Sequence, residues 1–288
     1  MESHKDLAPK VMKVLKVLFK IFVYVVCISL AILSIMPFWI MLMNATRSTT
    51  EIQQHAISLL PSGYLLNNLK ILLGKSFNPI NGFINSMIVS TGSTLCAVYF
   101  STLTAYAIVV YDWKLKRPFF TFIMAVMMIP SQVVTIGFYQ MIYKVGLVNS
   151  FLPLILPAIA SPAMVFFMRQ YMVGALSLEI VQSARIDGAK EFYIFNKIAL
   201  PIMKPAIATQ AIFSFVSSWN NLFLPLILLR NDKYTMPIMV SLLRGDIYKT
   251  EYGSVYLGLT LTVLPLFIVY FLLSKYIIAG VALGSVKG

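Results

Sequence analysis

Long apolar runs recur along this chain, and at about 20 residues each of them can cross the hydrocarbon core of a membrane. Hydrophobic residues make up 59% of the sequence, against roughly 45–50% in soluble domains, and charged residues make up 11%, against about 25%. An ordinary soluble domain is therefore excluded. The runs predict an all-α polytopic membrane protein with about six transmembrane helices, at residues 17–43, 81–110, 118–142, 150–172, 203–229 and 255–279.

A chain of 288 residues with these spans leaves room for one membrane domain, expected at 17–279. A basic segment, 1–16, precedes it and a short tail, 280–288, follows it. Basic residues recur every three or four positions in and after the first segment and share one side of a helix, namely Lys10, Lys13, Lys16 and Lys20. This pattern predicts an amphipathic helix on an anionic membrane surface, or a basic topological anchor. Both readings remain open.

The distribution of Lys and Arg predicts the orientation of the chain. With the N-terminus in the cytosol, roughly two thirds of the 23 Lys and Arg residues fall on cytosolic segments. Both termini and the charged stretch 183–201 are then cytosolic. The net charge of +13 is concentrated beside the apolar runs, so we assign it to membrane lipid and expect no nucleic-acid partner.

The second predicted span carries small residues at every third or fourth position, namely Ser86, Ser90, Thr94, Ala97, Ser101 and Ala105. Small side chains allow helix backbones to approach closely in lipid. The stripe predicts a packing face, with a pore-lining role as the alternative.

Acidic residues and His are missing from all six predicted spans. An ion-coupled carrier commonly has an ionisable group at the membrane midplane, although a sodium site made of carbonyl and hydroxyl groups stays possible. An intramembrane enzyme would need a catalytic dyad or metal ligands. The sequence therefore predicts no catalytic residue, no metal site and no enzymatic activity in this chain.

A segment that resembles the end of a P-loop, Gly74-Lys75-Ser76, does not alter this expectation. The motif requires a Gly five positions earlier, where this chain has Leu69, and it belongs to a parallel β-sheet context. Energy for transport would have to come from a partner.

A charged helix-turn-helix is predicted between the fourth and fifth spans. Ser177 can cap its first helix, and Glu179 lies in the first turn, where the helix dipole favours an acid. The helix is expected to run to about Ile186. Asp187 and Gly188 then form a turn in which Gly can adopt a positive φ.

The second predicted helix ends at Pro201 and has an aromatic side with Phe192, Phe195 and Ile198, while other sides carry Lys190, Glu191 and Lys197. Outside the bilayer, such an aromatic side must be covered. Either it folds back onto the chain's own bundle or the interface, or it inserts into a groove of a soluble protein. In the second case Phe192 or Phe195 fills the pocket.

The stretch QSARIDGAKEFYIFNKIALP resembles the cytosolic loop signature of ABC importer permeases, E-A-A-x3-G-x9-I-x-L-P. Gln182, Ser183 and Ala184 stand at the E-A-A positions and Gly188 at the motif Gly, and the signature closes with Ile198, Leu200 and Pro201. The ARIDGA portion resembles the carbohydrate-uptake branch, in the manner of the maltose and multiple-sugar permeases. Segments such as INSMIVSTGSTL, SSWNNLFLPL and the final GSVKG extend the similarity over nearly the whole chain.

The sequence departs from the family pattern at the first two motif positions. Gln182 replaces the usual Glu, and Ser183 replaces the first Ala. A Gln keeps the hydrogen-bonding reach but loses the charge, so an ion pair with the ATPase at this position is not implied for this chain. Arg185, Asp187 and Glu191 supply charge nearby.

The resemblance implies a multi-pass subunit of a prokaryotic plasma membrane that imports a sugar or oligosaccharide. Its implied partners are a second, homologous permease subunit, two cytosolic ATPase subunits that bind ATP and Mg, and an extracellular solute-binding protein. No cofactor is expected in this chain. The ATPase-coupling loop would comprise Gln182, Ser183, Ala184, Arg185, Asp187, Gly188, Lys190, Glu191, Phe192, Phe195, Ile198, Leu200 and Pro201.

Sugars bind to aromatic faces combined with amide or hydroxyl groups. That combination occurs at Trp219, Asn220 and Asn221 and at Tyr139 and Gln140, which are the candidate substrate-pathway residues. Trp219 can instead pack within the bundle. The outer loop 231–253 can meet the binding protein or be a solvated loop.

Two rival functions remain. A related permease for a non-sugar solute, such as a glycerol phosphate, would place a cationic residue in the cavity, and no Lys or Arg lies in the middle of a predicted span. An ion-coupled secondary carrier is the other.

Overall fold

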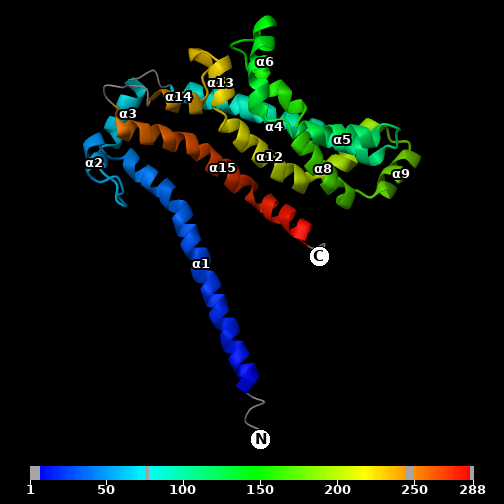
Figure 1. Ribbon diagram of the computed structural model, residues 1–288, viewed down its shortest axis with the longest axis horizontal. Coiled ribbons are helices and arrows are strands. Elements are labelled where there is room, and N and C mark those ends of the chain that lie inside the picture. The colour runs from blue at the N-terminus through cyan, green and yellow to red at the C-terminus, as the bar shows by residue number, and fades with distance from the viewer. Residues whose placement is uncertain (1–6, 75–77, 244–249, 286–288) are drawn as a thin grey trace. The chain divides into compact units, whose positions relative to one another are not determined.

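The computed structural model describes residues 7–74, 78–243 and 250–285, in which every regular element is helical (Figure 1). This agrees with the predicted all-α class. By their contacts the residues form two units: Met1–Gly74 with Lys249–Thr260, called unit 1, and Lys75–Tyr248 with Leu261–Gly288, called unit 2. The predicted terminal segments 1–16 and 280–288 and the P-loop-like Lys75 lie wholly or partly outside the described residues.

Unit 1 begins with α1 (Leu7–Ala45), a continuous helix that joins the predicted basic segment to the first span. Two short helices follow, α2 (Thr49–Gln54) and α3 (Leu65–Gly74). Ser48 and Glu51 form a capping box at the start of α2, which satisfies two backbone N–H groups.

Asn68 on α3 holds the end of α1 in place. Its side-chain amide donates to the carbonyls of Ala45, at 2.9 Å, and Arg47, at 2.8 Å. Gly253, near the start of α15 (Tyr252–Ser285), packs so closely against the carbonyl of Arg47 that a Cβ would not fit.

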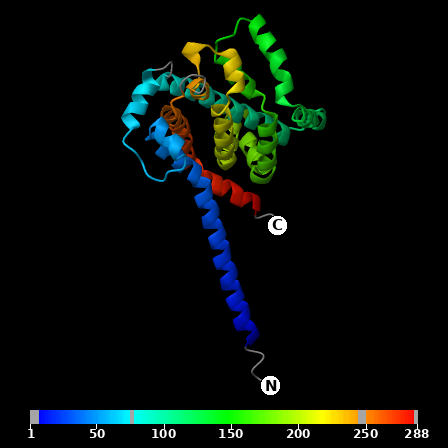
Figure 2. The same cartoon turned by 60° about the vertical axis from the view of Figure 1, so that its left-hand side comes forward.

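Unit 2 is built around α4 (Pro79–Val110). The helix starts with Pro79 at its first position, and the side chain of Asn78 accepts a hydrogen bond from the N–H of Asn81 at 3.1 Å. α4 packs against α8 (Pro162–Ala175) and α12 (Lys204–Trp219), as Figure 2 shows. All six residues of the predicted small stripe on α4 are buried, which confirms the packing face.

Four helical stretches of the described residues are long and apolar enough to span a membrane: Leu15–Ala45, Pro79–Val110, Leu152–Ala175 and Tyr252–Leu272. A fifth arises if Glu191–Ile202 and Lys204–Trp219, which are bent by 79° relative to each other, count as one span. Four of the six predicted spans therefore have a counterpart by length and composition, or five if the bent pair is counted.

The predicted span 118–142 is divided into α5 (Lys116–Val126) and α6 (Ser131–Lys144). Pro130 lies at the division, where it lacks an N–H and disfavours helical geometry in the residue before it. α6 extends away from α4 and contacts α13 (Phe223–Leu228) (Figure 1). At Pro130 the apolar run is broken, whereas Pro37 in α1 and Pro265 in α15 lie inside continuous helices, and hydropathy alone does not distinguish the two cases.

The predicted spans 150–172 and 203–229 are interrupted as well. The first consists of α7 (Leu152–Ile155), a 3₁₀ turn, η1 (Leu156–Ile159), and α8. In the second, α12 ends at Trp219, and α13 starts after a short break. A 3₁₀ turn, η3 (Asn231–Lys233), and α14 (Met236–Leu243) complete unit 2 before α15.

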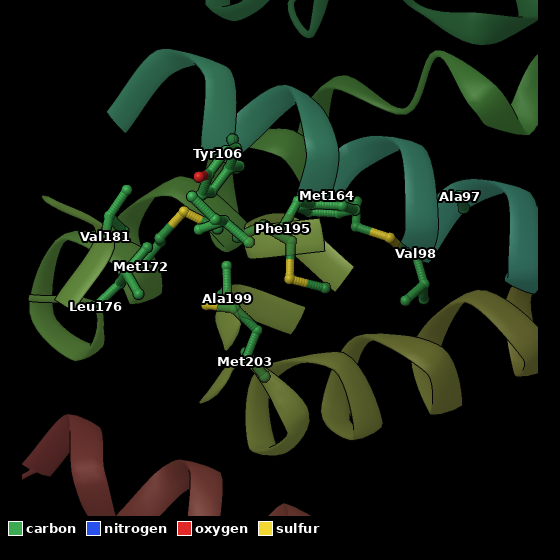
Figure 3. Close-up of a cluster of buried hydrophobic side chains, with 14 of the residues drawn as sticks. Ala97, Val98, Tyr106, Met164, Met172, Leu176, Val181, Phe195, Ala199 and Met203 are labelled. Carbon is green, nitrogen blue, oxygen red and sulfur yellow. The ribbon is translucent and has the colours of Figure 1, made fainter. Parts of the chain in front are cut away.

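The main core of unit 2 lies where the cytosolic loop predicted from the sequence meets the helices. Buried residues from α4, α8, α9 (Leu178–Ile186) and the stretch 194–206 form one cluster around Phe195 (Figure 3). Four methionines belong to this cluster, namely Met164, Met168, Met172 and Met203. Methionine side chains are flexible, so this core can adapt to small shifts of its parts.

Candidate functional site

The candidate coupling loop begins with the helix and the turn that the sequence predicts. The backbone N–H of Glu179 donates to the Ser177 hydroxyl at 3.2 Å, and α9 ends at Ile186. Gly188 has φ +79°, and its N–H donates to the carbonyl of Arg185 at 3.0 Å. The predicted cap, helix end and glycine turn are thus confirmed.

The helix after the turn differs from the prediction. It consists of α10 (Glu191–Ile194), a π-helical turn, η2 (Phe195–Ala199), and α11 (Leu200–Ile202), which Pro201 does not end. A π-turn is wider than an α-turn and changes which residues share a side, and such turns are frequent at functional sites.

Phe192 and Phe195 do not share one side of a helix, contrary to the prediction from the sequence. The Phe195 side chain is 1% exposed, and its ring lies 5.4 Å from that of Tyr106 on α4 (Figure 3). The Tyr99 ring, also on α4, lies 5.6 Å from it. Phe192 lies at the start of α10 and is 69% exposed. Phe195 is a core residue, and only Phe192 is free to contact a partner.

An exposed apolar knob is formed by Ile186, Phe192 and Tyr193, which are 87%, 69% and 57% exposed. Ile186 closes α9 and the other two open α10, so the knob surrounds the turn at Gly188. Sequence reasoning did not select Ile186 or Tyr193. Their positions close to the Gly188 turn could have indicated them, because side chains beside a tight turn tend to lie at the surface.

The remaining motif residues divide into an exposed and an inward set. Gln182, Ser183, Asp187, Lys190, Lys197 and Pro201 are exposed, and all but Pro201 are polar or charged. Ala184 is buried, and Ile198 and Leu200 pack against the core, which holds the loop on the bundle.

Glu191 fastens the loop to the end of α4. Its carboxylate accepts from Arg185 Nε at 2.5 Å, from the Tyr111 hydroxyl at 2.5 Å and from the Tyr106 hydroxyl at 3.4 Å. The Arg185 guanidinium also lies 5.3 Å from the Tyr111 ring centre. The bond from Arg185, followed by that from Tyr111, holds the pKa of Glu191 below its ordinary value. Burial, followed by the bond to Glu191, raises the pKa of Tyr111.

A second link joins the loop to α4 one helical turn further on. The Asn196 side chain donates to the carbonyl of Phe192 at 2.8 Å and accepts from the Tyr99 hydroxyl at 3.3 Å. Polar contacts at the start of α10 and in the π-helical turn that follows it thus connect the loop to one long helix.

Trp219, a candidate substrate-pathway residue, packs within the bundle. Its ring contacts those of Phe83 and Phe215, and its indole N–H donates to the carbonyl of Thr262 on α15 at 3.1 Å. Thr262 precedes Pro265, which interrupts the hydrogen bonding of α15. Trp219 is 1% exposed, so its faces are not available to a ligand.

Asn221 lines two neighbouring cavities. The first, about 670 Å³, is mainly apolar and is bounded by Val126, Val134, Thr135, Phe138, Pro153, Leu154, Pro157, Ala160, Phe223 and Leu224. The second, about 310 Å³, has a polar wall formed by Ser93, Ser161, Gln210, Ser214, Ser217 and Ser218.

The other candidates lie outside both cavity walls. Asn220 is exposed, Tyr139 is partly exposed with its ring near Tyr143, and Gln140 is exposed. Thr135 and Phe138 on the same helix line the larger cavity instead. Sequence reasoning did not select these serines or Gln210, although Ser217 and Ser218 stand in the quoted segment SSWNNLFLPL, because it chose the aromatic and amide residues of that segment instead.

The sequence is similar to a family of transport permeases. Residues 97–282 match the model of the family described as binding-protein-dependent transport system inner membrane component. The arabinooligosaccharides transport system permease protein of Halalkalibacterium halodurans is 36% identical, over 90% of this chain and 93% of the relative. The lactose transport system permease protein of Rhizobium radiobacter is 32% identical, over 89% and 92%.

A solved structure shares the fold. One chain in the crystal structure of a bacterial ABC transporter involved in the import of the acidic polysaccharide alginate superposes with a TM-score of 0.78. The match covers 90% of this chain and 96% of the other, at 22% sequence identity.

Proposed function

Because this chain belongs to the family of binding-protein-dependent transport system inner membrane components, we propose that it forms half of the pathway of an ATP-driven importer for a neutral sugar or oligosaccharide. It works as a transport permease and carries out no chemistry itself. ATP and Mg bind to a partner ATPase, which supplies the energy.

The observation that carries this proposal is the exposed apolar knob on an anchored base. Ile186, Phe192 and Tyr193 protrude, while the adjacent Ile194 and Phe195 are buried. Burial of apolar side chains of this size against a partner lowers the free energy, because it removes their surface from water. Aromatic residues are typical anchors of interfaces. A groove of the cytosolic ATPase is the proposed partner surface.

The contacts of Glu191 provide a path from this knob to the membrane. A shift of the knob acts on Tyr111 and Tyr106 through Glu191, and on α12 through the bend after Ile202. The methionine-rich core around Phe195 allows such a shift without loss of packing. The cavity would alternate between access from outside and access from inside. ATPases that close on ATP would bind one of these two states more tightly and so shift the equilibrium toward it.

The polar cavity supports a neutral polyhydroxylated substrate. Its wall offers hydroxyl and amide groups from Ser214, Ser217, Ser218, Gln210 and Asn221, and no charged side chain lines either of the two cavities beside Asn221. A glycerol phosphate would require a cation near its phosphate. Trp219 takes no direct part in this proposal, and Asn221 is the candidate that remains in contact with the pathway.

The other subunits are assigned from the family. A second permease subunit would cover the apolar residues of α6, such as Val133 and Ile136, which are 73% and 72% exposed. An extracellular solute-binding protein would deliver the sugar from the side opposite the knob. Both termini and the coupling loop would lie in the cytosol of a prokaryotic cell.

Uptake by the assembled importer in proteoliposomes tests this function. We expect ATP-dependent sugar uptake that continues when ionophores collapse the ion gradients and stops when the ATPase is omitted. Uptake that follows an ion gradient without the ATPase would identify a secondary carrier and refute the proposal.

A further inference from the structure

A small cavity of about 260 Å³ lies where α4 ends and α5 begins, apart from the coupling loop and from the two cavities near Asn221. Three basic side chains line it, Lys116, Arg117 and Arg169, together with the carboxylate of Asp112. Ile108 and Phe120 form its apolar part. Its volume is several times the roughly 30 Å³ that a water molecule occupies in the liquid, which leaves room for a phosphate group.

Arg169 is held in place but is not saturated with acceptors. Its guanidinium lies 4.6 Å from the centre of the Phe120 ring, and one terminal nitrogen donates to Gln170 Oε1 at 2.5 Å. Its Nε is buried and finds no acceptor within the described part of the chain. A buried donor without an acceptor costs free energy, and an anion in the cavity would remove that cost.

The other charges do not cancel. Lys116 Nζ donates to the backbone carbonyl of Tyr111 at 3.0 Å, and Asp112 forms an ion pair with none of the three cations in the described ranges. The lining therefore keeps an excess of two positive charges. The start of α5 adds to this field, because Leu115 provides no side-chain cap for the first N–H groups.

The position of the cavity indicates a headgroup rather than a cytosolic solute. α4 is 32 residues long, or about 48 Å at 1.5 Å per residue, so its ends extend beyond a hydrocarbon core of about 30 Å. Asp112 lies just beyond its last residue, Val110, and Lys116 and Arg117 open α5 after a short connection. Trp113, which is 38% exposed, lies beside them, as aromatic residues do at membrane interfaces.

We propose that this cavity binds the phosphate group of an anionic phospholipid. The basic residues hold the phosphate, and the apolar wall of Ile108 and Phe120 faces the glycerol and upper acyl region. Exposed apolar residues on α5, Phe119 and Phe122, continue that surface for the acyl chains. Lys116 donates to the backbone carbonyl of Tyr111, and the hydroxyl of Tyr111 donates to Glu191. A lipid bound by Lys116 would therefore be linked to the coupling loop through the single residue Tyr111.

Binding of short-chain lipids to the full-length chain in an uncharged detergent tests this site. The rise of the thermal midpoint with lipid concentration gives an apparent Kd for dioctanoyl phosphatidylglycerol, dioctanoyl phosphatidylcholine and inorganic phosphate. We expect phosphatidylglycerol to bind clearly more tightly than the other two. Equal binding of the two lipids, or of inorganic phosphate and phosphatidylglycerol, would overturn the proposal.

Variants locate the binding. Arg117→Gln and Arg169→Gln should each weaken phosphatidylglycerol binding about fivefold, whereas Lys114→Gln, an exposed neighbour outside the cavity wall, should leave it unchanged. Asp112→Asn should tighten binding about fivefold because it removes the one negative charge. Misfolding cannot produce a gain of affinity, so an unchanged or weakened Kd in this variant would contradict the site.

The principal alternative occupant is an acidic side chain of a neighbouring subunit. In that case Arg117→Gln would leave the lipid Kd unchanged and would reduce copurification of the ATPase or the second permease. That result would refute lipid binding here. It would leave the import function itself untouched, because uptake is measured separately.

Discussion

Arg185 and Glu191 form an ion pair of 2.5 Å across the turn at Gly188. The pair joins the last turn of α9 to the first turn of α10, and the Tyr111 hydroxyl donates to the same carboxylate from the end of α4. The loop is thus closed on itself and fastened to a long helix by one acidic residue. Both side chains of the pair are more than a third exposed, so the pair adds little to the free energy of unfolding. Its main effect is to fix the position of α10 relative to α9.

Replacing Glu191 with Gln should loosen the loop in a pH-dependent way. The folded protein lowers the pKa of Glu191 from 4.5 because Arg185 and Tyr111 donate to the ionised form. Its stabilisation is therefore fully present above pH 4.5 and is lost as the pH falls through the lower folded pKa. The folded protein raises the pKa of Tyr111 above 10, so the contribution of Tyr111 is lost only as the pH rises through that higher value.

Thermal midpoints of the wild type and Glu191→Gln between pH 3 and pH 8 measure this effect. We expect a constant difference at neutral pH that shrinks in acid below pH 4.5. Glu179→Gln, an exposed acid at the start of α9, serves as the control and should show no comparable trend. A difference that does not change with pH would argue against the carboxylate as the fastening group.

Replacing Gly188 with Ala should destabilise the loop by about 1–2 kcal/mol, the cost of the left-handed conformation for a residue with a Cβ. The added Cβ would meet no atom within 4 Å, so backbone strain is the only cause. Gly188→Asn should cost less, because Asn tolerates this conformation. Gly137→Ala on α6 also adds a Cβ in open space and should not destabilise the fold. Equal losses at both glycines would exclude the strain explanation.

Phe192 and Phe195 should respond to Ala in opposite ways. Phe195→Ala removes a buried ring and should cost about 3–5 kcal/mol of stability. Phe192→Ala should leave the thermal midpoint nearly unchanged but weaken association with the ATPase, measured by copurification and ATP-dependent uptake. Normal uptake with Phe192→Ala, Tyr193→Ala and Ile186→Ala combined would remove the knob from the mechanism.

Trp219 and Asn221 separate stability from transport. Trp219→Phe loses the hydrogen bond to the Thr262 carbonyl and should cost about 1 kcal/mol of stability. Asn221→Ala should leave the thermal midpoint unchanged and raise the KM for sugar uptake, because this residue lines both cavities. A raised KM in Trp219→Phe but not in Asn221→Ala would show that Trp219, and not Asn221, contacts the substrate.

Features set by local physical rules could be predicted from the sequence. The Ser177 cap, the end of α9 and the positive φ of Gly188 depend on nearest neighbours along the chain, and the small stripe on α4 depends on helical periodicity. The spans were predicted by apolar length. The break near Pro130 was not, because a proline in an apolar run permits either a kinked helix or an end.

Features that depend on contacts between distant segments could not be predicted. Glu191 and Tyr111 are 80 positions apart, and no pattern links them. Periodicity placed Phe192 and Phe195 on one side, but only the packing of Tyr99 and Tyr106 decides which ring enters the core. The serine-lined cavity also arises from segments far apart along the chain, and no pattern within any one of them shows that their side chains meet.

Labelling of single cysteines in the knob tests the central claim most directly. Cys27 and Cys96 are replaced with Ala, and Ile186→Cys or Tyr193→Cys is treated with a membrane-impermeant maleimide in vesicles of known orientation, with Val145→Cys as the opposite-side control. The account predicts labelling of the knob only from the cytosolic side, protection by the bound ATPase, and a change of that protection with ATP. Labelling from the external side, or labelling that the ATPase does not affect, would contradict it.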